Sequence, residues 1–192
     1  MDSITVLEML KSVDAVREGH FKFSSGLHGE VYVQCALLLK EPDLTGKICA
    51  ALADHFRKEQ PEIVVGPAMG GVIAAYETAR QLGVPGIFAE RENGKMTLRR
   101  NFSVKPGQRV LVVEDVITTG GSSQEVVDML ESRGAVVIGV GSIVDRSNGT
   151  AKLSVPFYSL LKIKVNNYDP AECPLCKAGR PLYRPGSRDI SK

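Results

Sequence analysis

The sequence predicts an α/β protein whose mostly parallel central sheet is flanked by helices. Short apolar segments typical of buried strands alternate with segments of helical period along most of the 192 residues, a pattern that favours a parallel sheet covered on both faces. Hydrophobic residues make up 43% of the chain and charged residues 24%, which is typical of a globular protein with a large core. Because no linker or repeat divides the chain, we expect a single domain over residues 1–192.

The N-terminal part is predicted to contain two helices and two short strands. Apolar residues recur at three- and four-residue steps from residue 3 to about residue 17, which predicts a helix closed by Gly19. Residues 21–23 and 31–33 are rich in strand-forming residues around a turn-rich segment, and we expect a strand in each. Pro42 favours the start of a second helix, which carries four apolar residues on one side: Leu44, Ile48, Leu52 and Phe56.

The rest of the chain alternates predicted strands and helices. Apolar strands are expected at residues 63–66, 86–89, 109–113 and 135–140. Helices are expected at residues 71–82, ended by Gly83, and at residues 123–132, ended by Gly134. Ser122 and Glu125 match a capping box, which predicts where the second of these helices begins.

Charge and hydropathy exclude several classes of protein. The net charge of +2 is far from the strongly basic patch that is typical of nucleic-acid binding. No apolar run reaches the roughly 18 residues that a membrane span needs, and the N-terminus lacks the basic and apolar segments of a secretory signal. We therefore expect a cytoplasmic protein with no nucleic-acid partner and no membrane contact.

The most informative segment is a strand followed by two carboxylates and a turn of small residues that opens a helix. Glu114 and Asp115 come at the end of the strand and are expected to point into the crevice at the carboxyl ends of the sheet. Residues 118–123 supply backbone N–H groups at a helix N-terminus, which attracts phosphate. Carboxylates accept hydrogen bonds from hydroxyl groups such as those of ribose. Because the Gly-Lys-Ser/Thr end of a Walker A loop is absent, these features indicate a phosphorylated sugar as ligand.

The segment from Val112 to Ser122, VVEDVITTGGS, resembles the motif with which type I phosphoribosyltransferases bind 5-phosphoribosyl-1-pyrophosphate (PRPP). The resemblance implies the fold of that family, in which a small N-terminal hood covers a mostly parallel α/β core. It implies a hood at about residues 19–40, a PRPP-binding core at about 41–165 and a C-terminal arm at 166–192. The residues that it assigns to PRPP are Glu114, Asp115, Val116, Ile117, Thr118, Thr119, Gly120, Gly121 and Ser122.

Within that family the chain is similar to the orotate phosphoribosyltransferases nearly from end to end. Residues 21–26 and 32–34 resemble their hood, residues 65–71 their pyrophosphate loop, and residues 88–96 the start of their mobile catalytic loop. The pair Asp145-Arg146 matches their orotate-binding arginine. The resemblance implies transfer of the phosphoribosyl group of PRPP to orotate, which yields orotidine 5′-monophosphate and pyrophosphate on the route to UMP.

The resemblance also assigns roles in substrate binding. Arg146 is implied to hold the carboxylate of orotate, because a guanidinium group binds a carboxylate through two hydrogen bonds. Taken alone, this arginine would be interpreted as part of a surface ion pair. Thr118 is implied to face the base as well as the phosphate, and Met69 and Gly70 lie in the implied pyrophosphate loop.

A basic segment between residues 91 and 109 resembles the lid that closes over pyrophosphate in this family and then opens to release the product. Four of its cations are expected to belong to the lid: Arg91, Lys95, Arg99 and Arg100. Lys105 and Arg109 are expected on a solvated face. The implied catalytic residues are Arg91 and Lys95, which stabilise the leaving group, and Asp115, which holds the ribose together with Glu114.

The resemblance implies a cofactor and a quaternary state as well. Mg²⁺ is implied to bridge the pyrophosphate and ribose oxygens, because this hard cation prefers oxygen ligands and keeps several waters. We therefore expect no metal site built from the protein's own side chains. The lid of the family reaches into the active site of the neighbouring subunit, which implies a homodimer with shared active sites.

The chain departs from the family pattern at three places. Ser24 stands where many members carry a lysine in the hood, and Met69-Gly70 stands where they carry a Tyr-Lys pair. Met96 lies near the place of the lid histidine. Two phosphate-binding charges of the family are therefore absent or come from other residues.

Cys173 and Cys176 have the CxxC spacing of metal-binding or redox sites. A structural zinc normally takes four ligands, and none of the three histidines, His20, His28 and His55, is near the pair in sequence. A partly buried C-terminal arm is the favoured interpretation, with a zinc shared between two subunits or redox chemistry as alternatives. His28, on a glycine-flanked turn, is expected to contact either substrate or solvent.

Two other functions are consistent with parts of the sequence. A transferase of the same fold for another base is the nearest alternative, but a neutral purine has no carboxylate to pair with Arg146. A transcription regulator that uses the fold as a PRPP sensor is the alternative from another class. The roughly twenty residues before the hood are too few for a helix-turn-helix domain, and the basic lid favours an enzyme.

Overall fold

The structure is a computed structural model, which describes residues 1–23 and 25–185. Ser24 of the implied hood and the last residues of the implied C-terminal arm therefore lie outside the described residues. The central sheet has the strand order β5-β4-β3-β6-β7-β8, and its pairs are parallel except for β4 with β5. Its strands are β3 (Ile63–Pro67), β4 (Gly86–Glu92), β5 (Lys95–Thr97), β6 (Arg109–Ile117), β7 (Val136–Asp145) and β8 (Phe157–Lys162).

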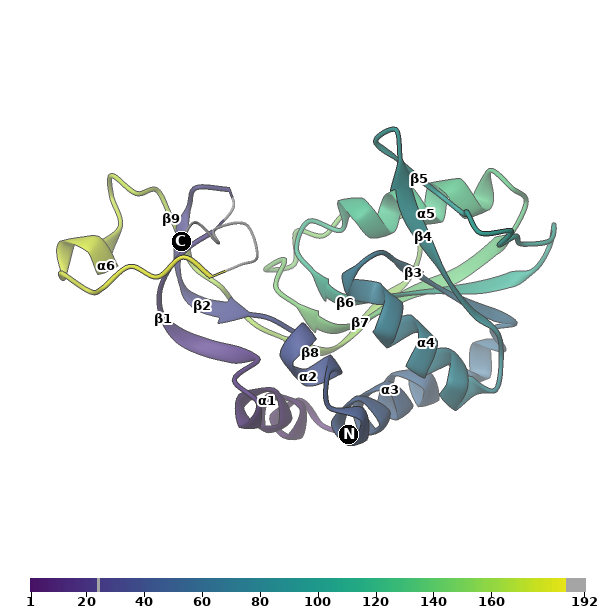
Figure 1. The fold of residues 1–192 in the computed structure, drawn as a ribbon, viewed down its shortest axis with the longest axis horizontal. Helices are drawn as coiled ribbons and strands as arrows, with labels where there is room; N and C mark the ends of the chain where they lie inside the picture. The colour runs from purple at the N-terminus through teal and green to yellow at the C-terminus, as the bar shows by residue number, and fades with distance from the viewer. Residues whose placement is uncertain (24, 186–192) are drawn as a thin grey trace.

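Helices cover both faces of this sheet, as the alternation of apolar strands and helices predicted. In Figure 1, α3 (Pro42–Phe56) and α4 (Gly70–Leu82) lie on one side of the sheet and α5 (Gly121–Glu131) on the other. Successive residues of β6 point to opposite faces: Leu111 and Val113 join the core beneath α3 and α4, whereas Val110 and Val112 join the core beneath α5. The predicted α/β class with a mostly parallel sheet is thus confirmed.

A second, smaller sheet lies beside the main one (Figure 1). Its order is β1-β2-β9, and all its pairs are antiparallel. In the chain, α1 (Ser3–Ser12) precedes β1, and the short helix α2 (Ala36–Leu39) follows β2. A 3-10 turn, η1 (Arg57–Glu59), follows α3. The strands are β1 (Val16–Lys22), β2 (His28–Val33) and, from the C-terminal arm, β9 (Asn167–Tyr168); α6 (Pro174–Lys177) follows.

The first helix is shorter than predicted. It ends at Ser12, and Asp14 adopts a positive φ of 57°, which reverses the direction of the chain. Val16 then begins β1, where Gly19 lies within the strand instead of closing a helix. Val16 is a β-branched residue and packs in the core of this region, an environment that favours a strand over a helix.

Three further predictions need correction in the central sheet. β6 continues through Glu114 and Asp115 to Ile117, β7 extends to Asp145, and β8 is an additional edge strand. The capping box is wrong, because α5 begins after Gly120, whose φ is 82°, and no side chain caps it. By contrast, α4 ends where predicted, with Gly83 at a φ of 75°.

The basic segment, whose start resembles a mobile loop in sequence, begins as a β-hairpin. β4 and β5 form an antiparallel hairpin whose turn is Asn93-Gly94, both with positive φ. Asn-Gly is a strong hairpin signal, and it was present in the sequence. Met96 and Leu98 are buried in the core on the α5 side of the sheet, which holds the hairpin in place.

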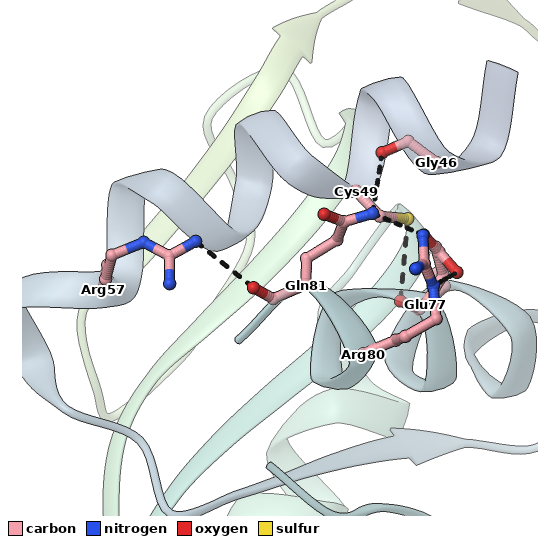
Figure 2. A network of polar contacts seen from close by, with 7 residues as sticks. Gly46, Cys49, Arg57, Glu77, Arg80 and Gln81 are labelled. Carbon is pink, nitrogen blue, oxygen red and sulfur yellow. Dashed lines mark hydrogen bonds and ion pairs between the residues drawn. The ribbon is translucent and has the colours of Figure 1, made fainter. Parts of the chain in front are cut away.

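α3 and α4 are joined by polar contacts at their outer edge (Figure 2). The Gln81 side chain donates to the Gly46 carbonyl at 3.5 Å and to the Glu77 carboxylate at 2.7 Å. The Cys49 thiol donates to the Ala74 carbonyl at 3.7 Å.

Among the described residues, no helix is both long and apolar enough to cross a membrane.

The seating of α3 on β7 requires glycine at position 141. A Cβ atom on Gly141 would lie 2.9 Å from Phe56 Cε2 and 3.2 Å from Leu52 Cδ1. Gly141→Val should therefore lower the free energy of unfolding by about 1–3 kcal/mol, the usual cost of overpacking, as measured by urea denaturation. Val136→Thr is the control on the same strand, because Val136 is 47% exposed. Equal midpoints for wild type and Gly141→Val would contradict this packing.

Candidate functional site

The candidate site begins where the N-terminus of α4 meets the carboxylates of β6. A Cβ atom on Gly70 would collide with the Asp115 carboxylate, and one on Gly71 would lie 3.0 Å from Glu114 Oε1. These contacts bring the predicted pyrophosphate loop and the predicted ribose-binding carboxylates together. Met69, the other residue assigned to that loop, is 85% exposed.

The segment assigned to PRPP forms a small polar cavity at the start of α5. The cavity measures about 70 Å³ and is lined by Glu114 and by residues 116–123. Gly120, at the N-cap with a φ of 82°, lets the chain turn sharply into the helix. The backbone N–H of Gly121 contacts Thr119 Oγ1 at 3.3 Å. A polar pocket at a helix N-terminus has the donors and the dipole that bind a phosphate group.

The two carboxylates of β6 differ from ordinary surface acids. Both are partly buried, and the Asp115 backbone N–H donates to Glu114 Oε1 at 3.1 Å, while the Val116 N–H donates to Asp115 Oδ1 at 2.9 Å. Burial, together with the negative charge of Asp115, raises the pKa of Glu114 to about 9. At neutral pH Glu114 is therefore protonated in the unliganded crevice, so its carboxyl group can donate one hydrogen bond.

Arg146 lies beside this pocket because β6 and β7 pair in register. Ile117 pairs with Asp145, and the backbone N–H of Arg146 donates to the Ile117 carbonyl at 2.9 Å. The Arg146 guanidinium is centred 5.0 Å from the ring of Phe23, which follows β1. Burial lowers the pKa of Arg146. No acidic side chain among the described residues pairs with it, so a partly buried cation is available to an anionic ligand.

Thr118 and Asp145 take different parts in this arrangement. Thr118 is exposed at the mouth of the cavity that the PRPP segment forms. Asp145 is buried and accepts a hydrogen bond from the Ser147 backbone N–H at 2.8 Å. Asp145 therefore shapes the turn after β7, and Arg146 is the member of the pair that remains free for a ligand.

Three arginines of the basic segment form ion pairs with acidic neighbours. Arg91 makes two hydrogen bonds to Glu125 of α5, at 2.7 and 2.9 Å. The remaining ion pairs are Arg99 with Glu92 at 3.3 Å and Arg100 with Glu90 at 3.1 Å. Within the described residues, no hydrogen bond or ion pair joins Arg91 or Lys95 to Glu114 or Asp115. The structure thus places Arg91 at the first turns of α5 and leaves Lys95 exposed on β5.

The last two cations of the basic segment lie away from the hairpin. Lys105 is exposed. Arg109 donates to the Glu59 carbonyl and has the Glu59 carboxylate at 3.8 Å. Their predicted place on a solvated surface, away from the lid, agrees with these contacts.

A cluster that the sequence interpretation missed lies in the small sheet. His20 and His28 place ring nitrogens within 4.8 Å of the thiol sulfurs of Cys173 and Cys176. No histidine is near the cysteine pair in sequence, yet two lie beside it in space. His28 is buried in this cluster, which corrects the expectation that it faces solvent. About 150 residues separate the two halves of the cluster, too far for any spacing motif to connect them.

Comparison with known proteins agrees with this geometry. A family model described as the phosphoribosyl transferase domain matches residues 37–175. The solved orotate phosphoribosyltransferase of Aeropyrum pernix superposes with a TM-score of 0.68 at 26% identity, covering 82% of this chain and 93% of that one. Fold and crevice together define the class of protein, a type I phosphoribosyltransferase.

Two curated relatives show to which family within this class the chain belongs. A protein of Chlorobium phaeobacteroides named orotate phosphoribosyltransferase is 51% identical over 188 residues, which is 98% of this chain and 97% of the relative. A protein of Thermotoga maritima with the same name is 53% identical over 185 residues, 96% of this chain and 99% of the relative. The chain belongs to the orotate phosphoribosyltransferase family.

The raised pKa of Glu114 predicts a pH-dependent effect of its substitution. This carboxyl group stabilises the fold fully below its ordinary pKa of 4.5, and that contribution is lost as the pH rises towards about 9, because the unfolded chain ionises first. Glu114→Gln should therefore gain stability relative to wild type as the pH rises through this window, by up to a few kcal/mol. Urea unfolding of the unliganded proteins at several pH values measures the difference. A flat difference would contradict a carboxyl group kept protonated by burial.

Proposed function

We propose that the chain transfers the phosphoribosyl group of PRPP to orotate, giving orotidine 5′-monophosphate and pyrophosphate, as a step of UMP synthesis. The observation that carries the choice of base is the partly buried guanidinium of Arg146, which has no acidic partner among the described residues and lies next to the PRPP segment. Such a group favours a base that bears a carboxylate. The names of the close relatives support the same assignment.

In the proposed reaction the crevice binds PRPP in three parts. The 5′-phosphate occupies the cavity at the start of α5, and the ribose hydroxyls bind Glu114 and Asp115. The pyrophosphate lies against the loop at Gly70, where the start of α4 offers free N–H groups. The bond between C1 of the ribose and pyrophosphate breaks as a ring nitrogen of orotate, which loses its proton, forms the new bond. The protein contributes mainly positioning and stabilisation of the departing charge.

Mg²⁺ is the proposed cofactor, and the donor set of the crevice is compatible with it. Glu114 and Asp115 present hard oxygen atoms, and neither forms an ion pair among the described residues. These residues would hold the ribose hydroxyls close to the cation. When bound, Mg²⁺ supplies charge neutralisation of the leaving group. Loss of turnover in excess chelator, restored by added Mg²⁺, would support the proposal, and full activity in chelator would contradict it.

The hairpin of β4 and β5 is the proposed lid. When this hairpin closes, it would break its ion pairs and contact pyrophosphate instead. Breaking the pairs costs little free energy, because exposed ion pairs stabilise a fold by only about 0–1 kcal/mol each. Arg91 and Glu125 are both about half exposed. Arg91 and Lys95 are the residues that we propose to neutralise the leaving group.

We also propose a homodimer whose interface includes α4. Ile73 and Tyr76, which are 48% and 65% exposed, rim an apolar cavity of about 240 Å³. It is lined by Val72, Ile73, Tyr76, Gly86, Ile87, Phe88 and Phe102. Contiguous exposed apolar surface of this kind is typical of an interface. Sedimentation equilibrium at micromolar concentration tests this, and a monomer would contradict it.

The cysteines support a cytoplasmic location, which we propose as well. All four are free of disulfides. Burial raises the pKa of Cys35 well above its usual range and that of Cys49 to about 12, so both thiols are inert. Free thiols persist in a reducing compartment. Cell fractionation would test the location, and recovery of the protein outside the cytoplasmic fraction would contradict it.

The proposed reaction predicts a selective defect in Arg146→Ala. Wild type should consume orotate with PRPP and Mg²⁺ in an ultraviolet assay and leave uracil, hypoxanthine and adenine unchanged. Arg146→Ala should raise the KM for orotate about 100-fold, because two charge-assisted hydrogen bonds are lost, while PRPP affinity is retained. Arg17→Ala, which removes an exposed arginine of β1, is the control. Activity on another base alone would contradict the choice of orotate.

Substitution of Lys95 tests the lid. Lys95→Ala should lower kcat about 100-fold, the usual effect of losing one group that stabilises transition-state charge, and should weaken PRPP binding far less. Lys105→Ala, in the same basic segment, should behave as wild type. An unchanged kcat in Lys95→Ala would remove this residue from the mechanism.

A further inference from the structure

Four potential metal ligands converge between the small sheet and the C-terminal arm. His20 comes from β1, His28 from β2, and Cys173 and Cys176 lie at the start and within α6. Their ligand atoms all lie within 4.8 Å of one another. His20, His28 and Cys173 are 2%, 4% and 0% exposed. Burying three such polar ligand atoms beside a fourth is costly unless a cation joins them.

The distances between these atoms match the edges of a tetrahedron around zinc. Zn–N bonds of about 2.0–2.1 Å and Zn–S bonds of about 2.3 Å put tetrahedral ligands about 3.3–3.8 Å apart. His20 Nε2 lies 3.1 Å from His28 Nδ1 and 3.6 Å from each of the two thiol sulfurs. Cys176 Sγ lies 3.3 Å from His28 Nδ1. Four of the six edges are therefore close to the size that a tetrahedral zinc site requires, and the other two, from Cys173 Sγ to Cys176 Sγ and to His28 Nδ1, do not exceed 4.8 Å.

The surroundings of His20 prepare it as a ligand. Its Nδ1 lies 2.9 Å from the Arg180 carbonyl oxygen, which can only accept a hydrogen bond. Nδ1 therefore carries the proton, and the lone pair of Nε2 points towards the cysteines. A backbone carbonyl that holds the second ring nitrogen in this way is the usual outer partner of a metal-binding histidine.

We propose that His20, His28, Cys173 and Cys176 bind one structural zinc ion. Two thiolates and two neutral imidazoles cancel the charge of Zn²⁺, and binding releases the two thiol protons without any oxidation or reduction. Mixed nitrogen and sulfur ligands in tetrahedral geometry select zinc over the oxygen-preferring Mg²⁺. Cys176 is exposed, which gives the ion a route of entry. A site closed by four protein ligands is structural and not catalytic.

The ion would fasten the C-terminal arm to the β1–β2 hairpin. The arm touches the same residues through its backbone: Tyr183 N–H donates to the His20 carbonyl at 2.8 Å, and Tyr168 of β9 pairs with His28. Phe23, one residue after β1, contacts Arg146. The zinc site thus holds the hairpin that carries Phe23 over the candidate site. Metal binding itself does not depend on the proposed transfer reaction.

Metal analysis of the purified full chain tests the proposal. The protein is made without a histidine tag and under reducing conditions. It should contain about one zinc per chain, as measured by inductively coupled plasma mass spectrometry. Cys173→Ser and Cys176→Ser should lose at least nine-tenths of it. Cys49→Ala and His55→Ala are matched controls, since Cys49 lies in α3 and His55 stacks on Tyr158, and both should retain the metal. Zinc retained in both cysteine variants would overturn the site.

A second measurement does not depend on the folding of any variant. Wild-type protein stripped by chelator and then given Co²⁺ should develop the intense visible absorption of tetrahedral cobalt with thiolate ligands. Absence of both zinc and this spectrum would overturn the proposal, as would a Cys173–Cys176 disulfide in metal-free protein from reducing medium.

Hydrogen exchange tests the role of the ion in the same preparation. Removal of the metal should speed exchange of the β1 and β2 amides at least tenfold and leave β6 unchanged, because only the small sheet loses a tether. Unchanged exchange in β1 and β2 would overturn the structural role.

Discussion

The close approach of helix α4 to strands β3 and β6 is the constraint on which the rest of the site depends. A Cβ atom on Gly66 would collide with the Gly71 carbonyl, and one on Gly71 would lie 2.8 Å from the Val113 carbonyl. Glycine at both places lets the helix N-terminus reach the carboxyl ends of the strands. Glu114 and Asp115 then share the crevice with free N–H groups of the helix. Without this approach the carboxylates and the predicted pyrophosphate loop would lie apart.

The register of the parallel strands extends this constraint to the base. Because Ile117 pairs with Asp145, Arg146 emerges beside the phosphate pocket. Its partly buried position depends on the small sheet as well, since Phe23 contacts its guanidinium group. The proposed specificity element therefore combines Arg146, which follows a strand of the main sheet, with Phe23 beside the small sheet, and the C-terminal arm pairs with that small sheet through β9. Parts of the chain that are distant in sequence depend on one another for this one contact.

The sequence pattern predicted secondary structure correctly where local forces decide it. The apolar strands β3 and β6, the helix α4 and its closing Gly83 follow from hydrophobic period and from glycine's tolerance of positive φ. The errors arose where tertiary contacts compete with propensity. Residues 13–17 have a helical pattern, yet Val16 joins β1 because the core accepts it there. Glu125 pairs with Arg91 instead of capping α5, since a bidentate ion pair is available between α5 and β4.

The sequence by itself determined the class of fold and predicted the segment that lines the cavity at the start of α5, because both depend on contiguous residues with a recognisable period and motif. It also singled out Arg146, through a resemblance tied to its place after a strand, and the role of this residue stays a prediction. Only the tertiary structure decided that Met96 and Leu98 join the core, that burial keeps Glu114 protonated, and that two histidines meet the cysteine pair. The first two depend on burial between neighbouring strands and helices. The third depends on contacts between residues more than a hundred positions apart. Such contacts carry no local signal, because the folded core alone sets which side chains lose water and which become neighbours.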